Sequence, residues 1–195
     1  MPPKAKITKE MILNTVLDIT REAGVGCVNA RSISSRLRCS TRSVFTCFEN
    51  MDELKREFLE YSYEFYSQYV GEFGGTELIN PCLVLPVSYI KFAKEEPNLF
   101  RFLFISYMDL SMVKPGDFYK EAGNEKRKRI FSDTIGIEPE RAKEIFIDLF
   151  LNSHGIAVLA ATQKVTLDRE RIEKMVANML TALIRQEKPG WTLSL

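Results

Sequence analysis

The sequence is poor in the residues that build metal and catalytic sites. It contains four cysteines and a single histidine, His154. The cysteines are Cys27, Cys39, Cys47 and Cys82, and no two of them form a Cys-x-x-Cys pair. Zinc sites normally need closely spaced ligand pairs, so no metal or other cofactor is expected. No phosphate-binding loop, nucleophile–base spacing or carboxylate pair is visible either, and the chain is not expected to be an enzyme.

Turn-forming residues and long apolar runs are also scarce. Ten glycines and eight prolines are too few for a turn-rich β-sandwich or a disordered chain. No apolar run approaches the roughly 18–20 residues that span a bilayer, so no membrane partner is expected. The basic start, residues 1–6, lacks the apolar stretch of a signal peptide. A cytoplasmic protein with free thiols is therefore the expectation.

Charge is unevenly distributed, although the formal net charge is only +1. Residues 1–48 carry eight lysines and arginines against three acids, so the remainder of the chain is mildly acidic. A basic head on an acidic body is typical of a polyanion-binding module joined to a non-binding one, although a solvated basic face has the same composition. Lys4 and Lys6 extend this head and are candidates for an arm that reaches phosphate or the minor groove.

Helical periodicity dominates the chain, and no stretch alternates with period two over six residues, so the predicted fold is all-α. The apolar pattern predicts a first helix over 8–23, two short helices within 29–48 and a long fourth helix opening at Asn50. Gly71–Gly75 is predicted to be a linker. Further helices are expected near 78–95, 98–110, 117–135, 139–162 and 169–187.

Helix boundaries are indicated by capping residues. Side chains that suit N-caps precede several predicted helices, and Asn50 with Glu53 resembles a capping box. Gly24 ends the first pattern, where a positive φ is easily adopted. The other predicted N-caps are Thr8, Asn29, Ser40 and Asp168, with Pro97 and Pro139 in first helical turns.

The segment 29–48 predicts a helix-turn-helix. Ile33 and Leu37 are one turn apart on its first helix, and Val44 and Phe48 are one turn apart on its second. Burial of these side chains leaves the outer face of the second helix exposed. That face carries hydroxyls and an arginine with no acid before Glu49, a composition that suits contact with phosphates and base edges in a major groove.

The residues of this region resemble the N-terminal domain of the TetR family. The resemblance is carried by Ile12-Leu13, Ala23-Gly24, Asn29–Ser34 and Cys39–Phe48, and Asn50–Leu54 is similar to the family's start of helix four. The family commonly reads glycine-valine-serine-x-glycine-threonine-(leucine/valine)-tyrosine-x-tyrosine-phenylalanine across the turn and recognition helix. The resemblance implies DNA contacts from Asn29, Ser40, Thr41, Arg42, Ser43, Phe45, Thr46 and Lys55.

Several positions depart from the family's pattern. Arg38 and Arg42 stand where the family often has glycine, and Cys47 stands where tyrosine is usual. Met51 replaces a frequent phosphate-binding lysine, a contact that Lys55 could supply one turn later. Phe45 keeps an aromatic ring without its hydroxyl, which leaves an apolar contact to a sugar or a thymine methyl. Arg31 and Arg36 are either DNA contacts or solvated and salt-bridged surface residues.

The remainder of the chain is rich in aromatic and large apolar side chains. Pro97–Phe104 and Asn152–Ala157 also resemble a variant of the family's C-terminal domain, which implies a pocket for an apolar or aromatic effector. The same side chains would otherwise simply fill a core, and His154 would be a buried or interface histidine. The candidate pocket residues are Phe92, Phe100, Phe104, Tyr107, Met108 and His154.

The last two predicted helices carry long apolar stripes, and the family resemblance implies that they pair with their counterparts in a homodimer. The sequence thus predicts a helix-turn-helix DNA-binding domain over 1–54 and a helical effector-binding and dimerisation domain over 55–195. The predicted function is a TetR-type repressor that binds a palindromic operator in double-stranded DNA as a homodimer and is released by a small effector. The alternatives are control by a protein partner or by a redox signal through Cys39 and Cys47, or action as an activator.

Overall fold

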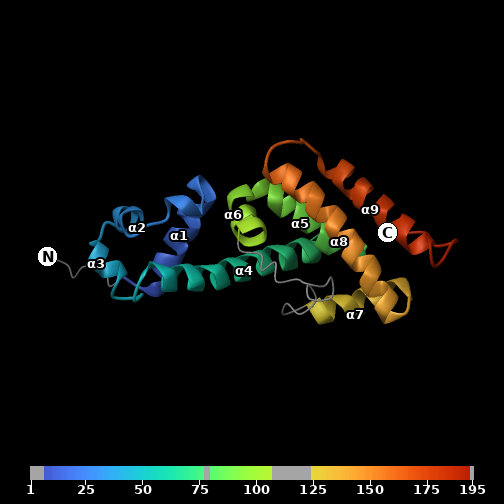
Figure 1. Ribbon diagram of the computed structural model, residues 1–195, viewed down its shortest axis with the longest axis horizontal. Coiled ribbons are helices and arrows are strands. Elements are labelled where there is room, and N and C mark those ends of the chain that lie inside the picture. Colours follow the sequence, from blue (N-terminus) through green and yellow to red (C-terminus); the bar gives the residue numbers. More distant parts are fainter. Residues whose placement is uncertain (1–6, 77–79, 107–123, 194–195) are drawn as a thin grey trace. The chain divides into compact units, whose positions relative to one another are not determined.

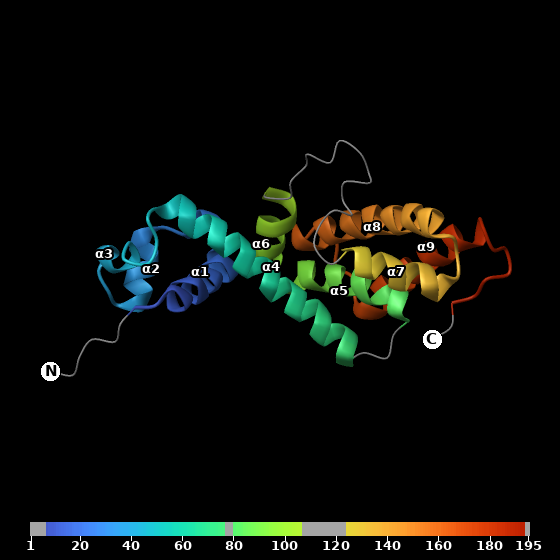
Figure 2. The same cartoon turned by 90° about the horizontal axis from the view of Figure 1, so that it is seen from below.

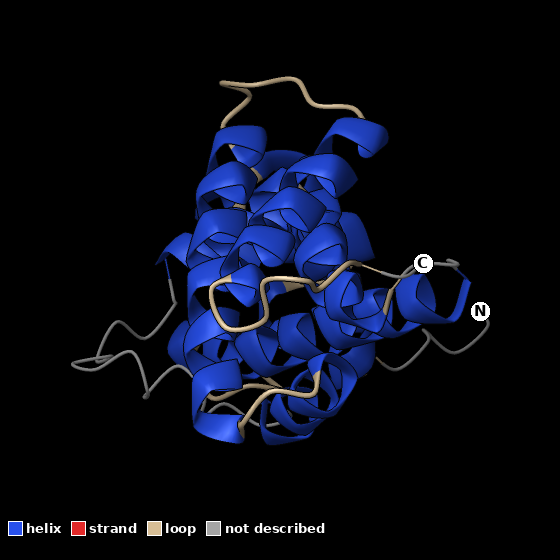
Figure 3. Ribbon diagram, turned by 90° about the vertical axis from the view of Figure 1, so that its right-hand side faces the viewer, coloured by secondary structure: helices blue, strands red, loops and turns tan. Residues whose placement is uncertain are grey.

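The computed structural model describes residues 7–76, 80–106 and 124–193. Within these ranges every regular element is a helix and there is no strand, which confirms the predicted all-α fold (Figure 3). A short 3-10 turn, Val25–Cys27, follows the first helix, and a π-helical turn spans Phe102–Ser106. In chain order the helices are α1 Lys9–Ala23, α2 Ala30–Leu37, α3 Thr41–Val44, α4 Met51–Thr76, α5 Pro81–Glu95, α6 Pro97–Arg101, α7 Asn124–Ile135, α8 Pro139–Ala161 and α9 Arg169–Arg185.

The helix starts predicted from capping residues are confirmed. The side chains of Thr8 and Asp168 each accept a hydrogen bond from the backbone N–H three residues later, at 3.2 and 2.7 Å. Pro97 and Pro139 lie in the first turns of α6 and α8, where a missing N–H costs nothing. Gly24 ends α1 with φ of 84°, the positive angle that its lack of a Cβ permits.

The capping box at the start of α4 is displaced by one residue. Asn50 Oδ1 accepts hydrogen bonds from the backbone N–H groups of Asp52 and Glu53. The Glu53 carboxylate accepts in return from the backbone N–H of Glu49 rather than that of Asn50. These hydrogen bonds fix the backbone from Glu49 to Glu53 at the start of α4.

The predicted linker at Gly71–Gly75 is wrong, because α4 continues through these residues. Each glycine costs a helix about 1 kcal/mol relative to alanine. Burial of Val70 and Phe73 on the same segment offsets that cost. Gly74 lies close to α5, and a Cβ added to it would be 3.1 Å from Val84 Cγ1. Gly74 is therefore a residue of close helix packing and does not interrupt α4.

The chain folds as two compact units. The first comprises the described residues of Met1–Ser67 and Glu96–Tyr107, and the second those of Gln68–Glu95 and Met108–Leu195. This structural division lies beyond the predicted domain boundary between residues 54 and 55. It also assigns a distant segment, α6 and the π-helical turn, to the N-terminal unit.

The core of the N-terminal unit joins α1 and α2 to the first half of α4 and to this distant segment. Ile12, Val16 and Ile33 are fully buried, the last as predicted, whereas Ala23 at the end of α1 is exposed. Phe58 on α4 stacks on Phe102 with ring centroids 5.1 Å apart.

Polar contacts also join α6 to the end of α1. Asn98 Nδ2 donates to the carbonyl of Arg21 at 2.9 Å and so satisfies a backbone group at the C-terminal end of α1. The Arg21 guanidinium pairs with Glu96, with N–O distances of 2.5 and 2.9 Å.

The second unit is a bundle of α5, α7, α8 and α9 with the end of α4 (Figures 1 and 2). Its core is apolar, and fully buried members are Ile90, Phe92, Leu149, Val176 and Leu180. Of the apolar stripes on the last two helices, Ile145, Ile156 and Ile172 are buried within this unit, whereas Leu159 is 48% exposed, and their pairing in a dimer stays a prediction. Pro86 lies inside α5, so the carbonyl of Cys82 lacks its usual helical donor.

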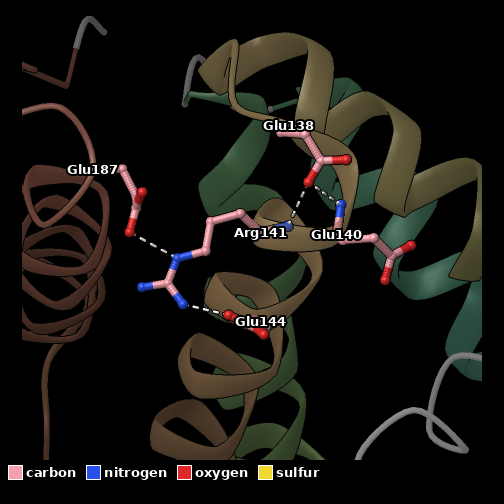
Figure 4. Close-up of polar contacts among 5 residues, drawn as sticks. All are labelled: Glu138, Glu140, Arg141, Glu144 and Glu187. Carbon is pink, nitrogen blue, oxygen red and sulfur yellow. Dashed lines mark hydrogen bonds and ion pairs between the residues drawn. The ribbon is translucent and has the colours of Figure 1, made fainter.

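Arg141 joins α8 to the residues that follow α9 (Figure 4). Its Nε donates to Glu187 Oε1 at 2.8 Å, and its Nη1 pairs with Glu144 one turn along α8. These hydrogen bonds hold the pKa of the guanidinium above its ordinary value. Glu138 caps the same helix by accepting from the backbone N–H of Glu140 at 3.0 Å. The cluster lies at the surface, where such pairs fix geometry more than they add stability.

Helix α8 is long and apolar enough to cross a membrane by length and composition alone, with a mean hydropathy of 1.4 over its most apolar window. The prediction that no apolar stretch approaches the length needed to span a bilayer is therefore wrong for α8. Ala142, Ile145, Leu149, Ser153 and Ala157 form a buried stripe on α8, as in the core helix of a folded bundle.

Candidate nucleic-acid interface and effector cavity

The helix-turn-helix begins at a complete capping box. Asn29 Oδ1 accepts from the backbone N–H groups of Arg31 and Ser32, both at 3.0 Å, and Ser32 Oγ accepts from the Asn29 N–H at 3.0 Å. The Asn29 Nδ2 donates to the Cys27 carbonyl at 3.3 Å. Asn29 was predicted to contact DNA, and the structure engages its side chain in fixing the start of α2.

The turn between α2 and α3 depends on a strained residue. Arg38 adopts the left-handed conformation, with φ of 51° and ψ of 42°. The following N–H, that of Cys39, returns to the Ser34 carbonyl at 3.0 Å and closes the turn. A residue with a Cβ pays a steric cost there that glycine does not pay. The turn at Arg38-Cys39 separates α2 from α3, in agreement with the two short helices predicted within 29–48.

Helix α3 is shorter than its predicted span from Ser40 to Phe48. Ser40 caps it as predicted, accepting from the Ser43 N–H at 3.2 Å, but the regular helix ends at Val44. Beyond Val44 the backbone continues in a tighter turn with hydrogen bonds between residues three apart, as the Thr46 N–H donates to the Ser43 carbonyl at 3.4 Å. Val44 and Phe48 are buried, as predicted.

The outward face of this short helix is exposed and acid-free as far as Cys47. Thr41, Arg42 and Thr46 are exposed, and Phe45 keeps 43% of its surface accessible. Phe45 is among the large apolar side chains that stay exposed in the described part of the chain, so its ring is accessible to a partner. The hydroxyl of Thr46 donates to the Ser43 carbonyl at 2.7 Å, so its oxygen can still accept a hydrogen bond.

The cations of the N-terminal unit fall into two groups. Lys9, Arg21 and Arg36 are engaged in ion pairs with Glu57, Glu96 and Glu22 respectively. Hydrogen bonding to Arg36 lowers the pKa of the Glu22 carboxyl, which keeps that pair ionised at neutral pH.

The second group has no such pairing. Within the described part of the chain, Arg31, Arg38, Arg42 and Lys55 form no ion pair. The structure therefore separates Arg31 from Arg36, two residues that the sequence left equivalent. Ion pairing with an acid of α1 could not be read from the sequence, because Glu22 and Arg36 are fourteen residues apart.

The second unit contains a mostly apolar cavity of about 280 Å³. It is bounded by the end of α4, by α5, and by α7 and α8. Among the side chains on its wall are Val70, Cys82, Val84, Phe131 and Phe146. Burial raises the pKa of the Cys82 thiol to about 11, so this group is neutral at physiological pH. No charged side chain of the described residues lines the cavity, so it suits an uncharged, apolar ligand.

The predicted pocket residues do not line this cavity. Phe100 and Phe104 belong to the N-terminal unit, where their rings pack together at 5.4 Å. Phe92 is fully buried and meets the Tyr69 ring edge-on at 5.2 Å. Tyr107 and Met108, like the proposed arm with Lys4 and Lys6, lie outside the described residues. Aromatic spacing along a helix cannot distinguish a core position from a cavity wall, since both are buried.

His154 is held between α5 and α8. Its Nδ1 lies 2.8 Å from the Tyr89 hydroxyl, and its ring packs against those of Tyr89 and Phe150 at 6.0 and 5.8 Å. Burial lowers the pKa of the imidazole below its ordinary value of 6.5, which favours the neutral form. This environment is that of a partly buried, hydrogen-bonded histidine. Among the described residues no group of three His, Cys, Asp or Glu side chains is placed to hold a metal ion.

Comparison with known proteins finds a likeness in fold and none in sequence. No family model and no curated protein matches the sequence. Among solved structures, a TetR-like transcriptional regulator from Rhodococcus sp. RHA1 superposes with a TM-score of 0.61. The match covers 98% of this chain and 100% of that chain, at 13% sequence identity.

The chain is thus an all-helical protein with a helix-turn-helix in its N-terminal unit and a helical bundle in its second unit. More specifically, its fold is that of a TetR-like transcriptional regulator, as the resemblance in the sequence implied.

Proposed function

We propose that the protein is a ligand-responsive transcriptional repressor that binds a palindromic operator as a homodimer in the cytoplasm. The observation that carries the proposal is the outward face of α3, where Thr41, Arg42 and Thr46 are exposed with no acid among them. Arg42 can donate to a phosphate or pair bidentately with a guanine, and the two threonines can reach phosphates or base edges. Ser40 and Ser43 keep predicted roles as phosphate contacts beside their part in the cap.

The unpaired cations extend this face beyond α3. Lys55 on α4 is a candidate phosphate contact in place of the lysine that Met51 replaces. Phe45 offers an apolar contact to a thymine methyl or a sugar, because its exposed ring has no hydroxyl to donate. Phosphate contacts position the protein, whereas Arg42 and Phe45 are proposed to contribute to the choice of sequence.

Two such units are needed to bind a palindrome, with their recognition elements about 34–36 Å apart. Leu151 and Leu159 on α8 are 60% and 48% exposed, so this helix presents two large apolar side chains at the surface of the unit. We propose that α8 and α9 pair with the same helices of a second copy and cover these side chains.

The effector is proposed to be a compact, uncharged and apolar molecule held in the 280 Å³ cavity. That size accommodates a ligand with a single ring or a short branched chain. A ligand that binds one dimer conformation better than another shifts the population away from the DNA-competent state by its differential affinity.

The test of DNA recognition compares single substitutions on the operator selected by the protein. Arg42→Ala should weaken specific binding by about 1–3 kcal/mol, and Phe45→Ala should relax the preference at one base pair. Lys164→Ala removes an exposed cation from the second unit and serves as the control, with no change expected. Equal losses in Arg42→Ala and Lys164→Ala would show that binding is only a response to net charge.

A further inference from the structure

A second, smaller cleft in the second unit has a different chemical character. Its volume is about 110 Å³, and it lies where the end of α4, the C-terminal half of α5 and the start of α9 meet. Among the described residues, none lines both this cleft and the 280 Å³ cavity. Its floor is apolar, because Phe73, Val87 and Ile172 are all 5% exposed or less.

Three cations and one carboxylate surround this apolar floor. The cations are Lys91 and Lys94 of α5 and Arg169 of α9, and the acid is Glu95. The Glu95 carboxylate already accepts a hydrogen bond from the Tyr69 hydroxyl at 2.6 Å and lies 3.8 Å from Lys91 Nζ. Among the described residues of the cleft wall the cations therefore outnumber the acids, even when Glu173, which pairs with Arg169, is counted.

The two lysines of α5 make defined contacts, although both keep part of their side chains exposed. Lys91 Nζ lies over the rings of Tyr69 and Phe73, at 5.6 and 5.3 Å from their centroids. Lys94 Nζ donates to the Leu167 carbonyl at 2.9 Å. A lysine pair on a solvated helix face would lack these contacts, so the arrangement is more than a generic basic surface.

Arg169, the first residue of α9, lies on the wall of the cleft opposite the lysines of α5. Its Nε donates to Glu173 Oε1 at 2.7 Å, one turn further along α9. This pair neutralises part of the charge of the guanidinium but leaves the two lysines of α5 facing the same cleft. The side chain of the N-cap residue Asp168 accepts a hydrogen bond from the backbone N–H of Arg171 at 2.7 Å.

We propose that this cleft binds a small organic carboxylate, with its carboxylate among Lys91, Lys94 and Arg169 and its compact apolar body on Phe73, Val87 and Ile172. The volume sets the size of that body: an apolar cavity of about 150 Å³ holds benzene, so a cleft of 110 Å³ accepts a ring in part or a short aliphatic chain. A carboxylate suits the charge and the floor together, whereas inorganic phosphate would leave the floor uncovered. The inference goes beyond the proposed function and does not require that the protein bind DNA.

The experiment titrates the full chain with benzoate by calorimetry, with benzamide as a neutral match of the same shape. Benzoate is expected to bind with one-to-one stoichiometry and a Kd of about 0.1–1 mM, weakening as salt rises. Benzamide should bind at least about tenfold more weakly, because it lacks the charge. Equal binding of benzoate and benzamide, or no saturable binding of benzoate, would overturn the proposal.

Matched variants locate the site. Lys91→Gln and Arg169→Gln should each weaken benzoate binding by about fivefold. Lys174 is an exposed lysine of α9 outside the cleft, and Lys174→Gln should leave benzoate binding unchanged. Arg169→Lys should restore most of the loss. Unchanged thermal unfolding of Arg169→Gln, whose side chain is 55% exposed, excludes misfolding as the cause. Equal weakening by Lys174→Gln, or displacement of benzoate by inorganic phosphate at similar concentration, would show a non-specific anion surface instead.

Discussion

At the scale of single residues, Thr20 in α1 shows how one atom can limit stability. Its side chain is fully buried, and its hydroxyl has no hydrogen-bond partner among the described residues. A buried hydroxyl without a partner carries a desolvation cost of about 1–3 kcal/mol. Thr15 on the same helix is a useful comparison, because its hydroxyl donates to the Met11 carbonyl at 2.8 Å.

Thr20→Val is expected to stabilise the protein by about 1 kcal/mol, since it keeps the shape of the side chain and removes the unsatisfied group. The midpoint of thermal unfolding should rise by about 2–4 °C. The control Thr15→Val removes a hydroxyl that has a partner and should leave the midpoint unchanged or lower. A fall in the midpoint for Thr20→Val would mean that the hydroxyl is satisfied in solution.

Arg38 gives a second test at this scale, because its left-handed backbone conformation disfavours any residue with a Cβ. Arg38→Gly should raise the free energy of unfolding by about 0.5–1 kcal/mol after allowing for the greater freedom of glycine in the unfolded chain. Gln163, with φ of 55°, is a matched position in the second unit, and Gln163→Gly should have a similar effect.

The two glycine variants should differ in DNA affinity. Loss of the Arg38 cation from the proposed binding face should weaken DNA binding and lower its salt dependence, whereas Gln163→Gly should change neither. No stabilisation in either variant would contradict the view that these positions are strained.

At the scale of elements, what the sequence predicted best were the ends of helices whose signals are local. The caps at Thr8, Asn29, Ser40 and Asp168 depend on side chains that bond backbone groups two or three residues away, so they are visible without a fold. The continuation of α4 through Gly71–Gly75 depends instead on burial of Val70 and Phe73 and on the approach of Val84. These contacts are tertiary, and glycine spacing alone does not reveal them.

The candidate sites divide in the same way. The helix-turn-helix face was predictable because a local pattern determines which side of α3 is buried. The cavity was not, because its wall combines α4, α5, α7 and α8, and the predicted aromatic residues Phe92, Phe100 and Phe104 are buried elsewhere. The partner of Arg36 was hidden for the same reason, since it belongs to α1.

The contact between α5 and α8 makes stability depend on pH through His154, the single histidine of the chain. Its pKa is lowered in the folded protein, so the unfolded chain binds a proton more readily. The stabilisation is complete above the unfolded pKa of 6.5 and is lost as the pH falls below it. The unfolding midpoint should therefore decrease between about pH 7.5 and 5.5, a range in which most carboxylates stay ionised.

His154→Gln is the control for this prediction, because glutamine can bond Tyr89 but does not titrate. Its unfolding midpoint should be nearly constant over the same pH range. An unchanged slope in the variant would assign the pH dependence to other groups.

At the scale of the whole molecule, the exposed leucines of α8 are expected to be covered by a second copy. Leu151→Glu combined with Leu159→Glu should give a monomer by light scattering, because four buried charges in a symmetric interface cannot be paired. Ile105→Glu changes a side chain of the N-terminal unit that is 43% exposed and should leave a dimer. Persistence of the dimer in the double variant would place the interface on another surface.

The central claim is that two copies of this chain read a specific palindrome through the α3 face. The most direct test is selection of the purified protein on a random duplex library, followed by measurement of affinity for the enriched sequence over a series of salt concentrations. The account predicts an enriched palindrome with half-sites about one helical turn apart and affinity that falls steeply as salt rises. Absence of any enriched sequence, with weak binding that does not distinguish one duplex from another, would contradict it.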